Sequence, residues 1–480
     1  MTTAEVIARV DAVFGDRVAR GLAPSSVWGV FDPSGLVASG GHGDRGDGTA
    51  PDASTVYRIA SCTKSVTAAT LLTLVADGRL DLDAPVTDFV PAFRAVELPT
   101  TDSPVPTVRM LLTMSAGFPT DDPWADRQES ISDDELDAVL TDGLLFDSVP
   151  GTGFAYSNLG YALLGRVVAV VSDEPYTATA TDRVLRPLGL HDTVFSAEDS
   201  NGFVVTGVRP YAGTWEPLPL TGPGAFSSIG GLYSTVSDLA RWGGHLASAF
   251  ADRPEPGPVA PADRRLMQQA MRVVPPVVVP GSTRATAYGF GLFVEQDDRH
   301  GPIASHSGGY PGFSAHMRWS TRHGIGVVAF ENATQAKVSQ AATEALDLLL
   351  DARERERETG RSARGPVAAE VAVLPQTREA QRRVSTLLAD WDDALADRIL
   401  SPNVALDEPY ERRRRHLAEA AAAVGADLTA APAEERSVAP THLRWWLPGA
   451  GGRLRVEIRL APLAAGLVQT MTVTAEPNEA

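Results

Sequence analysis

Cysteine is almost absent from this chain, and long apolar runs are missing altogether. Of the 480 residues only Cys62 is a cysteine, so no internal disulfide framework can form and nothing requires an oxidising compartment. No apolar run approaches the roughly 20 residues that would cross a bilayer as a helix. The first ten residues alternate charged and apolar side chains, without the continuous apolar core of a signal peptide. We therefore expect a cytoplasmic protein without a membrane partner.

Acidic residues outnumber basic residues in this chain, and lysine is rare among the basic ones. The chain has 42 lysine and arginine residues against 60 aspartate and glutamate residues, which gives a formal net charge of −18. Nucleic acids and anionic membranes require a basic face, so neither is an expected partner. Lysine occurs only at Lys64 and Lys337, and arginine supplies every other basic position of this count. An arginine does not lose its proton in proteins, so the lysine kept at Lys64 indicates a position where proton loss is useful.

Ser61 and Lys64 form an S-x-x-K pair at the start of an apolar helix. Apolar residues recur at helical spacing from Val66 to Val75, which places Ser61 in the first turn and Lys64 one turn later on the same face. A serine there can pass its proton to a neutral amine, and the free N–H groups of a helix start disfavour a positive charge. We interpret Lys64 as a base or proton relay, and we expect Lys64→Arg to be folded and inactive. The competing interpretation is a helix cap beside an ordinary surface lysine.

The order of predicted strands and helices outlines the first domain. Short segments bounded by turn residues predict strands near both ends of it, at 26–31, 36–40, 288–294, 304–308, 314–319 and 325–330. Helical patterns lie between them or follow them, at 61–76, 108–115, 158–171, 236–249 and 335–350. Strands contributed by both ends, with helices between, predict an α/β (α+β) fold in which one antiparallel sheet is flanked by helices and carries an all-helical insertion.

The last part of the chain is predicted to be a separate unit. Residues 351–376 are charged and then rich in Gly, Ala and Pro, which is typical of a linker after a first domain at 1–350. Helices at 377–400 and 411–424, followed by strands at 441–447, 453–460 and 467–475, predict a small accessory α+β domain at 377–480. No catalytic constellation is recognisable in it.

Two further motifs lie where they could meet the S-x-x-K pair. Tyr156 and Asn158 form a Y-x-N motif on a loop that leads directly into a helix. The run His306-Ser307-Gly308-Gly309 lies on a predicted strand. In a chain of this composition Y-x-N is much rarer by chance than H-x-G, so the first of these two motifs is the more specific. The order and placement of all three motifs suggest one shared cleft.

With these three motifs the sequence resembles the serine hydrolases of the class C β-lactamase and penicillin-binding-protein type. The resemblance covers roughly residues 5–350, with H-S-G-G in place of the family's K-T-G. It implies that Ser61 is the acylated nucleophile and that Lys64 and Tyr156 share proton transfer. It also implies that the N–H groups of Ser61 and Gly309 form an oxyanion hole, an arrangement that stabilises a tetrahedral intermediate. Because closely coupled groups titrate together, whether Lys64 or Tyr156 is the base stays open at this stage.

The same resemblance extends to the residues that would contact the substrate. It implies that Asn158 binds substrate or holds Lys64, and that His306, Ser307 and Gly308 lie beside the substrate. Asn332, after the last strand of the first domain, resembles a substrate-contacting position. No cofactor is implied, and the expected partner is a small-molecule or peptide substrate. His316 and His323 lack the spacing of a metal site, and Cys62 should face away from Lys64 as a buried structural residue.

His306 separates this chain from family members that recognise a substrate carboxylate with a permanent cation. With an unperturbed pKa of about 6.5 a histidine is mostly neutral near pH 7, so carboxylate binding should be weaker. We therefore expect hydrolysis, or acyl transfer, of carboxylic esters, amides or peptides, including those with D-residues. The alternatives are a peptide-cyclising thioesterase, a β-lactamase or D,D-carboxypeptidase, and a non-catalytic binding protein that has retained the cleft. A non-catalytic binding protein would have no need of intact Ser61, Lys64 and Tyr156, so their presence argues against that alternative.

Overall fold

The computed structural model describes residues 3–276, 284–361 and 372–478. The chain separates into two compact units, Met1–Glu356 and Arg357–Ala480, each with its own hydrophobic core. No helix in the described ranges is both long and apolar enough to cross a membrane.

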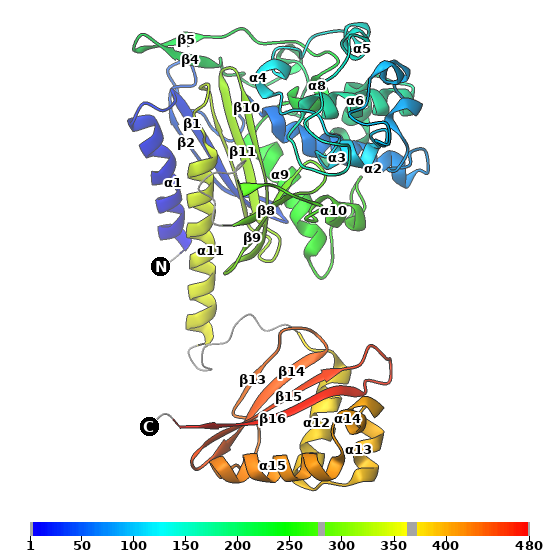
Figure 1. The fold of residues 1–480 in the computed structure, drawn as a ribbon. Helices are drawn as coiled ribbons and strands as arrows, with labels where there is room; N and C mark the ends of the chain where they lie inside the picture. The colour runs from blue at the N-terminus through cyan, green and yellow to red at the C-terminus, as the bar shows by residue number, and fades with distance from the viewer. Residues whose placement is uncertain (1–2, 277–283, 362–371, 479–480) are drawn as a thin grey trace. The chain divides into compact units, whose positions relative to one another are not determined.

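An antiparallel sheet built from both ends of the first unit carries its fold (Figure 1). Among the described residues its strand order is β2-β1-β12-β11-β10-β9-β8-β7. The strands are β1 Ser25–Asp32, β2 Gly35–Gly43, β7 Arg272–Val273, β8 Ala285–Tyr288, β9 Phe293–Asp297, β10 Gly301–Tyr310, β11 Phe313–Ser320 and β12 Gly326–Glu331. Because β1 pairs with β12, with Val27 opposite Phe330, strands some 300 residues apart are neighbours. The predicted antiparallel sheet with flanking helices is confirmed.

The regular structure of the chain between β2 and β7 is mainly helical, and of its helices α9 packs directly on the inner face of this sheet. The helices are α2 Thr63–Ala76, α3 Val108–Leu112, α4 Asp122–Ala125, α5 Asp133–Thr141, α6 Asn158–Ser172, α7 Tyr176–Ala180, α8 Ser227–Gly230, α9 Val236–Ala247 and α10 Pro261–Met267. Helix α9 packs on β1, β2 and β12, and α2 packs against α6 and α8. Since α2 has neighbours on all sides, its residues from Thr63 to Leu74 are buried, and Lys64 among them.

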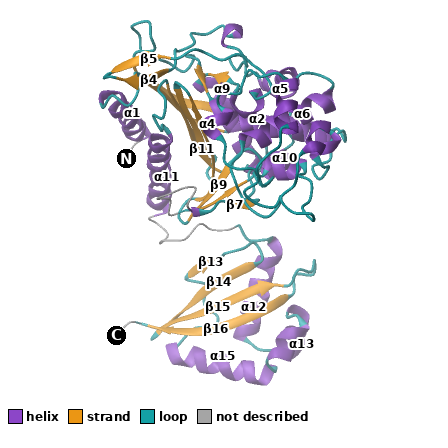
Figure 2. Cartoon of the chain, turned by 45° about the horizontal axis from the view of Figure 1, so that its top comes forward, coloured by secondary structure: helices purple, strands orange, loops and turns teal. Residues whose placement is uncertain are grey.

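Helices α1 (Thr3–Ala19) and α11 (Ser339–Arg361) lie side by side on the outer face of the sheet (Figures 1 and 2). Phe14 of α1 stacks on Trp28 of β1, with ring centroids 5.9 Å apart, and Leu346 of α11 lies in the same apolar cluster. Helix α11 continues well past the predicted end at residue 350. Residues 351–361 are mainly Arg and Glu, which favour helix, so the first part of the predicted linker is helical. Residues 362–371 of that linker lie outside the described residues.

Two short strand pairs were not predicted from the sequence. The hairpin of β4 (Val208–Tyr211) and β5 (Thr214–Pro217) lies on the surface. Strand β3 (Tyr57–Arg58) pairs with β6 (Tyr233–Ser234) and is entirely buried. The chain passes from β3 directly into the S-x-x-K motif, so this two-residue ladder fixes the approach to Ser61.

The second unit is a four-stranded antiparallel sheet with helices (Figure 2). Its elements are α12 Pro375–Ala389, α13 Asp393–Ile399, α14 Pro402–Asp407, α15 Tyr410–Val424, β13 Glu434–Arg436, β14 His442–Gly449, β15 Gly452–Leu460 and β16 Val468–Pro477. The strand order β13-β14-β15-β16 follows the chain order. Leu387 of α12 and Trp445 of β14 are fully buried in its core, which shares no residue with the cores of the first unit.

Candidate active site

Ser61 lies in a tight turn between β3 and α2. The sequence placed it in the first turn of an α-helix, whereas the structure has a 3₁₀ turn at Ala60–Cys62, with α2 beginning at Thr63. Ala60 adopts φ +45°, a left-handed conformation that is unusual for a residue other than glycine. Strain of this kind persists only where the surroundings enforce it, and here the turn is clamped between β10, α8 and the buried β3–β6 ladder.

The turn and β10 approach each other so closely that only glycine fits at Gly308. A Cβ atom there would lie 2.1 Å from the carbonyl oxygen of Ile59. From the other side, the thiol of Cys62 donates to the carbonyl oxygen of His306 over 3.4 Å. Cys62 is fully buried, in agreement with the structural role expected for it. The first and third motifs are therefore held in direct contact.

Lys64 is fully buried and points at Ser61. Its Nζ lies 2.9 Å from Ser61 Oγ, 2.6 Å from Asn158 Oδ1 and 2.8 Å from the carbonyl oxygen of Ile229. As an ammonium it donates to all three, whereas as a neutral amine it donates to two and accepts the proton of the Ser61 hydroxyl. Burial lowers the pKa of Lys64 to about 8, against the opposing effect of nearby aspartates, of which Asp122 acts most strongly. A minority of the lysine is therefore neutral near physiological pH, far more than for an exposed lysine.

Asn158 is held between Lys64 and the acidic residues at the start of α4. Its Nδ2 donates to Asp122 Oδ1 over 2.6 Å, while its Oδ1 accepts from Lys64. The carboxylate of Asp121 accepts the backbone N–H groups of Asn158 and Leu159, at 2.7 and 2.9 Å, and so fixes the start of α6. Of the two roles implied for Asn158, the structure shows the contact that holds Lys64.

Tyr156 closes the other side of Ser61. Its ring stacks on Phe293, with centroids 6.3 Å apart and planes 8° from parallel, and its centroid lies 5.1 Å from Lys64 Nζ. Burial raises the pKa of Tyr156 well above 10, with a further contribution from Asp122, and a hydrogen bond with Ser61 offsets part of the rise. The phenol is thus protonated while Lys64 is partly neutral, so the two groups beside Ser61 differ in protonation.

His306 is neutral and faces the interior. Burial, with the charge of Lys64, lowers its pKa to about 3. Its Nδ1 donates to the Ser307 carbonyl over 2.6 Å, so Nε2 accepts from the Tyr288 hydroxyl at 3.2 Å. The sequence predicts a third motif without charge, and the two hydrogen bonds of His306 agree with a neutral ring. The pKa of this buried histidine is lowered further than that of an exposed histidine would be.

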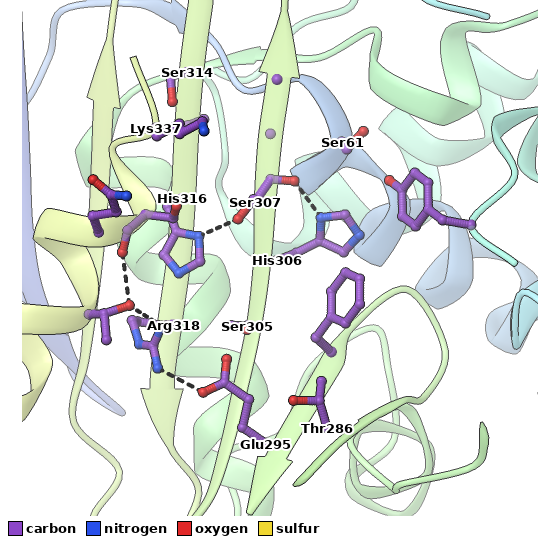
Figure 3. Close-up of a pocket in the computed structure, with 18 of the residues that line it drawn as sticks. Ser61, Thr286, Glu295, Ser305, His306, Ser307, Ser314, His316, Arg318 and Lys337 are labelled. Atoms are coloured by element: carbon purple, nitrogen blue, oxygen red, sulfur yellow. Dashed lines mark hydrogen bonds and ion pairs between the residues drawn. The ribbon is translucent and has the colours of Figure 1, made fainter. Parts of the chain in front are cut away.

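Ser307 faces the opposite side of β10 from His306 (Figure 3). Gly309, two residues on, is exposed on the same side of the strand, and both residues line the cleft. Ser307 Oγ lies 2.8 Å from His316 Nδ1 on the neighbouring strand β11. A Cβ atom built on Gly309 would meet no atom within 4 Å. Strand β10 therefore presents its alternate residues to two different environments, the packed nucleophile turn and the open cleft.

The structure brings most of the predicted site residues together. One cleft is lined by Ser61, Tyr156, His306, Ser307, Gly308 and Gly309. Lys64 and Asn158 lie directly behind it. Asn332 is the exception: its Oδ1 accepts from the backbone N and the hydroxyl of Ser25, at 3.0 and 2.8 Å, and its Nδ2 donates to Thr206 O over 3.1 Å. The expectation that Asn332 contacts substrate is corrected, because its polar atoms join β1 to the segment before β4.

Charged residues that sequence reasoning did not assign also line the cleft. Among them are Asp122, Asp126, Arg127 and Lys337. Burial, reinforced by Asp122, raises the pKa of Asp126 to about 6. Two features of the sequence pointed to these positions: the acidic residues before Tyr156 and the scarcity of lysine. Neither feature predicts which of these side chains line the same cleft.

A buried ion pair fixes the segment that carries the two aspartates. Arg58 of β3 pairs with Glu129, and both side chains are only 1% exposed. The guanidinium of Arg58 also lies 3.6 Å from the centroid of the Tyr310 ring, at the end of β10. Three segments that border the cleft therefore meet at one arginine, three residues before the nucleophile.

Comparisons with known proteins identify the family to which the chain is similar. The sequence model of the family described as Beta-lactamase matches residues 10–352. Protein flp of Staphylococcus aureus (strain MW2) is 28% identical over 289 residues, which are 58% of this chain and 53% of flp. The D-alanyl-D-alanine-carboxypeptidase/endopeptidase AmpH of Escherichia coli (strain K12) is 29% identical over 303 residues, covering 58% of this chain and 72% of AmpH.

A solved structure extends the likeness to the fold. The octameric penicillin-binding protein homologue from Pyrococcus abyssi superposes with a TM-score of 0.62 at 26% identity, over 72% of this chain and 77% of the homologue. The aligned part of this chain spans only about half the length of flp, 53% of it. The family match lies within the first unit, since it ends at residue 352.

Proposed function

The chain belongs to the β-lactamase family, and on that premise we propose that it is a serine hydrolase that forms an acyl-enzyme at Ser61. The observation that carries the proposal is the contact of 2.9 Å between Ser61 Oγ and a buried lysine whose pKa lies near 8. A nucleophilic serine requires a base within hydrogen-bond reach that is unprotonated at working pH. Lys64 lies within hydrogen-bond reach of Ser61, and its neutral fraction can accept the hydroxyl proton.

In the proposed acylation, Lys64 takes the hydroxyl proton as Ser61 Oγ attacks the substrate carbonyl. Tyr156 is not available as a base here, because burial raises its pKa well above 10 and the phenol stays protonated. As a phenol beside Ser61 it is suited to donate a proton to the leaving group, with Lys64 replenishing it. This division follows the general pattern in which the environments of two titratable groups move their pKa values apart.

The negative oxygen of the tetrahedral intermediate would be bound by the N–H groups of Ser61 and Gly309. Each such donor typically contributes about 10² to 10³ in rate. Collapse of the intermediate breaks the bond to the leaving group and leaves an ester on Ser61. Attack by water, with Lys64 again accepting a proton, releases the acid and restores the hydroxyl; attack by an amine would give acyl transfer instead.

Carboxylic esters, amides and peptides, including those with D-residues, are the proposed substrates. The name of AmpH supports D-residues, since it describes a carboxypeptidase and endopeptidase of D-alanyl-D-alanine. The neutral His306 supports substrates that do not need a cation at the third motif. A peptide-cyclising thioesterase, a β-lactamase or D,D-carboxypeptidase and a binding protein are the competing proposals.

Intact-protein mass spectrometry tests the acyl-enzyme directly. The protein is incubated with a fluorophosphonate or with a β-lactam, beside Ser61→Ala and Lys64→Arg. We expect an adduct on the unaltered protein, none on Ser61→Ala, and labelling of Lys64→Arg slowed by at least about a hundredfold, since arginine cannot serve as the base. Absence of a Ser61-dependent adduct with both reagents would favour the binding protein. Turnover of a nitrophenyl ester without turnover of a chromogenic cephalosporin would separate an esterase or peptidase from a β-lactamase.

A further inference from the structure

His300, in the turn between β9 and β10, is a buried histidine that the proposed chemistry at Ser61 does not use. The residue is 2% exposed. Within the described part of the chain, neither of its ring nitrogens has a hydrogen-bond partner. Buried polar side-chain atoms nearly always have one, so two orphaned nitrogens on one ring indicate a missing interaction.

The Nε2 atom of His300 faces two carboxylates of α11. It lies 3.5 Å from Asp351 Oδ1 and 3.7 Å from Glu354 Oε2, and one ligand atom from each of the three side chains lies within 4.8 Å of the others. The two acidic residues are three positions apart, so one helical turn brings both to the same side. Strand β9 and α11 lie next to each other in both views of the chain (Figures 1 and 2).

These separations are too long for hydrogen bonds but fit ligands around one metal ion. An N–H···O hydrogen bond spans about 2.7 to 3.2 Å. Zinc is bound at about 2.0 to 2.2 Å by imidazole nitrogen and carboxylate oxygen, so two such ligands at the tetrahedral angle lie about 3.3 to 3.6 Å apart. The distances from Nε2 to the two carboxylates lie within this range or just beyond it. An ion between the three atoms would therefore require only small side-chain movements.

Asp297 lies on the other side of the histidine ring. Its Oδ1 accepts the backbone N–H groups of Arg299 and His300, at 3.0 and 2.8 Å, and its Oδ2 accepts from Arg284 Nε over 2.7 Å. The carboxylate is thus fixed 3.1 Å from His300 Nδ1, although not aligned for a hydrogen bond. Histidines that bind metals usually direct their second nitrogen at such a carboxylate, which orients the ring. Asp297 has the position of this orienting group.

Arg299 contacts the same two carboxylates from the solvent side. Its Nη2 lies 2.6 Å from Asp351 Oδ1 and 3.4 Å from Glu354 Oε2. The arginine side chain is 58% exposed, and ion pairs of exposed side chains contribute little to stability. The guanidinium can therefore withdraw into solvent, whereas the buried His300 cannot. One guanidinium also balances only one of the two negative charges, and a divalent ion balances both.

We propose that His300, Asp351 and Glu354 together bind a zinc ion, which displaces the arginine side chain from both carboxylates. One imidazole and two carboxylates suit Zn²⁺ better than Mg²⁺ or Ca²⁺, which prefer oxygen ligands alone. Because His300 and Asp351 line the cleft, water can supply the fourth ligand. The ion joins the β9–β10 turn to α11 and stabilises the first unit. Seven residues of strand, roughly 20 Å, separate His300 from Ser307, so this site is distinct from the nucleophile.

Calorimetric titration of the full chain with Zn²⁺ tests the site, after removal of chelators and of any affinity tag. We expect one equivalent to bind, and the affinity to fall at least about tenfold in His300→Gln and in Glu354→Gln. The Glu354 side chain is 29% exposed, so its variant keeps the test valid if the buried histidine cannot be replaced without unfolding. Titration with Mg²⁺ should give no saturable heat at the same concentrations, and equal binding of both ions would contradict a zinc site.

Arg299→Gln distinguishes a metal site from a cluster of ion pairs. Removal of the competing cation should raise the affinity for Zn²⁺ about tenfold, whereas a cluster held together by the arginine alone would bind no zinc in this variant. His416→Gln is the matched control. His416 Nδ1 lies 2.7 Å from Glu408 Oε1 at an exposed position of the second unit, so this variant also removes a histidine beside a carboxylate. Its stoichiometry and affinity should equal those of the unaltered protein.

Thermal unfolding provides a second measurement. A ligand that binds only the folded state, at about a hundred times its Kd, should raise the Tm of the first unit by about 3 to 6 °C, and this rise should be lost in His300→Gln. Absence of saturable Zn²⁺ binding, or an affinity that is unchanged in both ligand variants, would overturn the proposal. Neither measurement requires turnover, so the result does not depend on the acyl-enzyme at Ser61.

Discussion

The side chain of Asn158 joins Lys64 to Asp122: its Oδ1 lies 2.6 Å from Lys64 Nζ, and its Nδ2 lies 2.6 Å from Asp122 Oδ1. The carboxylate of Asp122 thus acts on the amine through an oriented amide. In a buried site such a chain polarises each bond in it, so the proton affinity of Lys64 depends on a residue near the cleft entrance.

Activity should rise with pH through the titration of Lys64. The base form is the unprotonated amine, and the pKa of Lys64 is lowered to about 8, so kcat/KM for a neutral ester should increase up to about pH 8 and then level off. The pKa of His306, lowered to about 3, keeps this histidine neutral throughout the same range. A pH series corrected for spontaneous ester hydrolysis measures the profile. A rate that is flat or falls between about pH 6 and about pH 8 would exclude Lys64 as the base.

Asp122→Asn should move the rising part of the pH profile of kcat/KM, its acidic limb, to lower pH. Among the charges near Lys64 the carboxylate of Asp122 favours the ammonium most strongly, so its removal lowers the pKa of the amine further. The asparagine oxygen can still accept from Asn158, which keeps the geometry. Asp133→Asn, at a surface ion pair with Arg166, is the control and should leave the limb unchanged. A limb displaced to higher pH would contradict the coupling.

Gly308→Ala and Gly309→Ala should differ sharply in stability although they are neighbours. The new methyl at Gly308 would collide with backbone atoms of Ile59, so we expect a loss of about 1 to 3 kcal/mol in the free energy of unfolding. The methyl at Gly309 would enter open space, so the change there should stay within about 0.5 kcal/mol. Urea unfolding of both variants measures the difference, and the reverse order would show that β10 does not face the turn as described.

Asn332→Ala separates a structural role from substrate binding. The substitution leaves the buried N–H of Ser25 without its acceptor and should destabilise the protein by about 1 to 3 kcal/mol. KM should change by less than about twofold, because the side chain does not line the cleft. Unfolding and steady-state kinetics on the same preparation provide both values. A tenfold increase in KM at unchanged stability would restore the expectation derived from the sequence.

Local spacing explains why much of the site could be predicted from the sequence. Ser61 and Lys64 are three residues apart on one helical path, so their contact follows from helix geometry. Tyr156 lies just before a strongly apolar helix and Asn158 begins it, so the helical pattern locates both residues. The sheet was predictable because its strands are short apolar segments, several of them joined by short turns.

Other features depend on pairing between distant segments. The direction of Asn332 is set by Ser25, which is 307 residues away in the chain. The burial of Lys64 follows from the packing of α6 and α8 around α2, since the helix is enclosed on every side. Lys337 could be noticed from composition, but its place in the lining of the cleft requires the fold. Motif spacing does not contain such long-range relations.

The single thiol offers a direct view of motion at the nucleophile. Cys62 follows Ser61, is fully buried, and has its pKa raised to about 12 by that burial. A maleimide or disulfide reagent therefore finds no reactive thiolate while the turn and β10 stay in contact, and this chain offers it no second cysteine. The speed of thiol modification in the unaltered protein thus reports how often these two walls separate, and its slowing by a bound ligand would reveal occupancy without any engineered label.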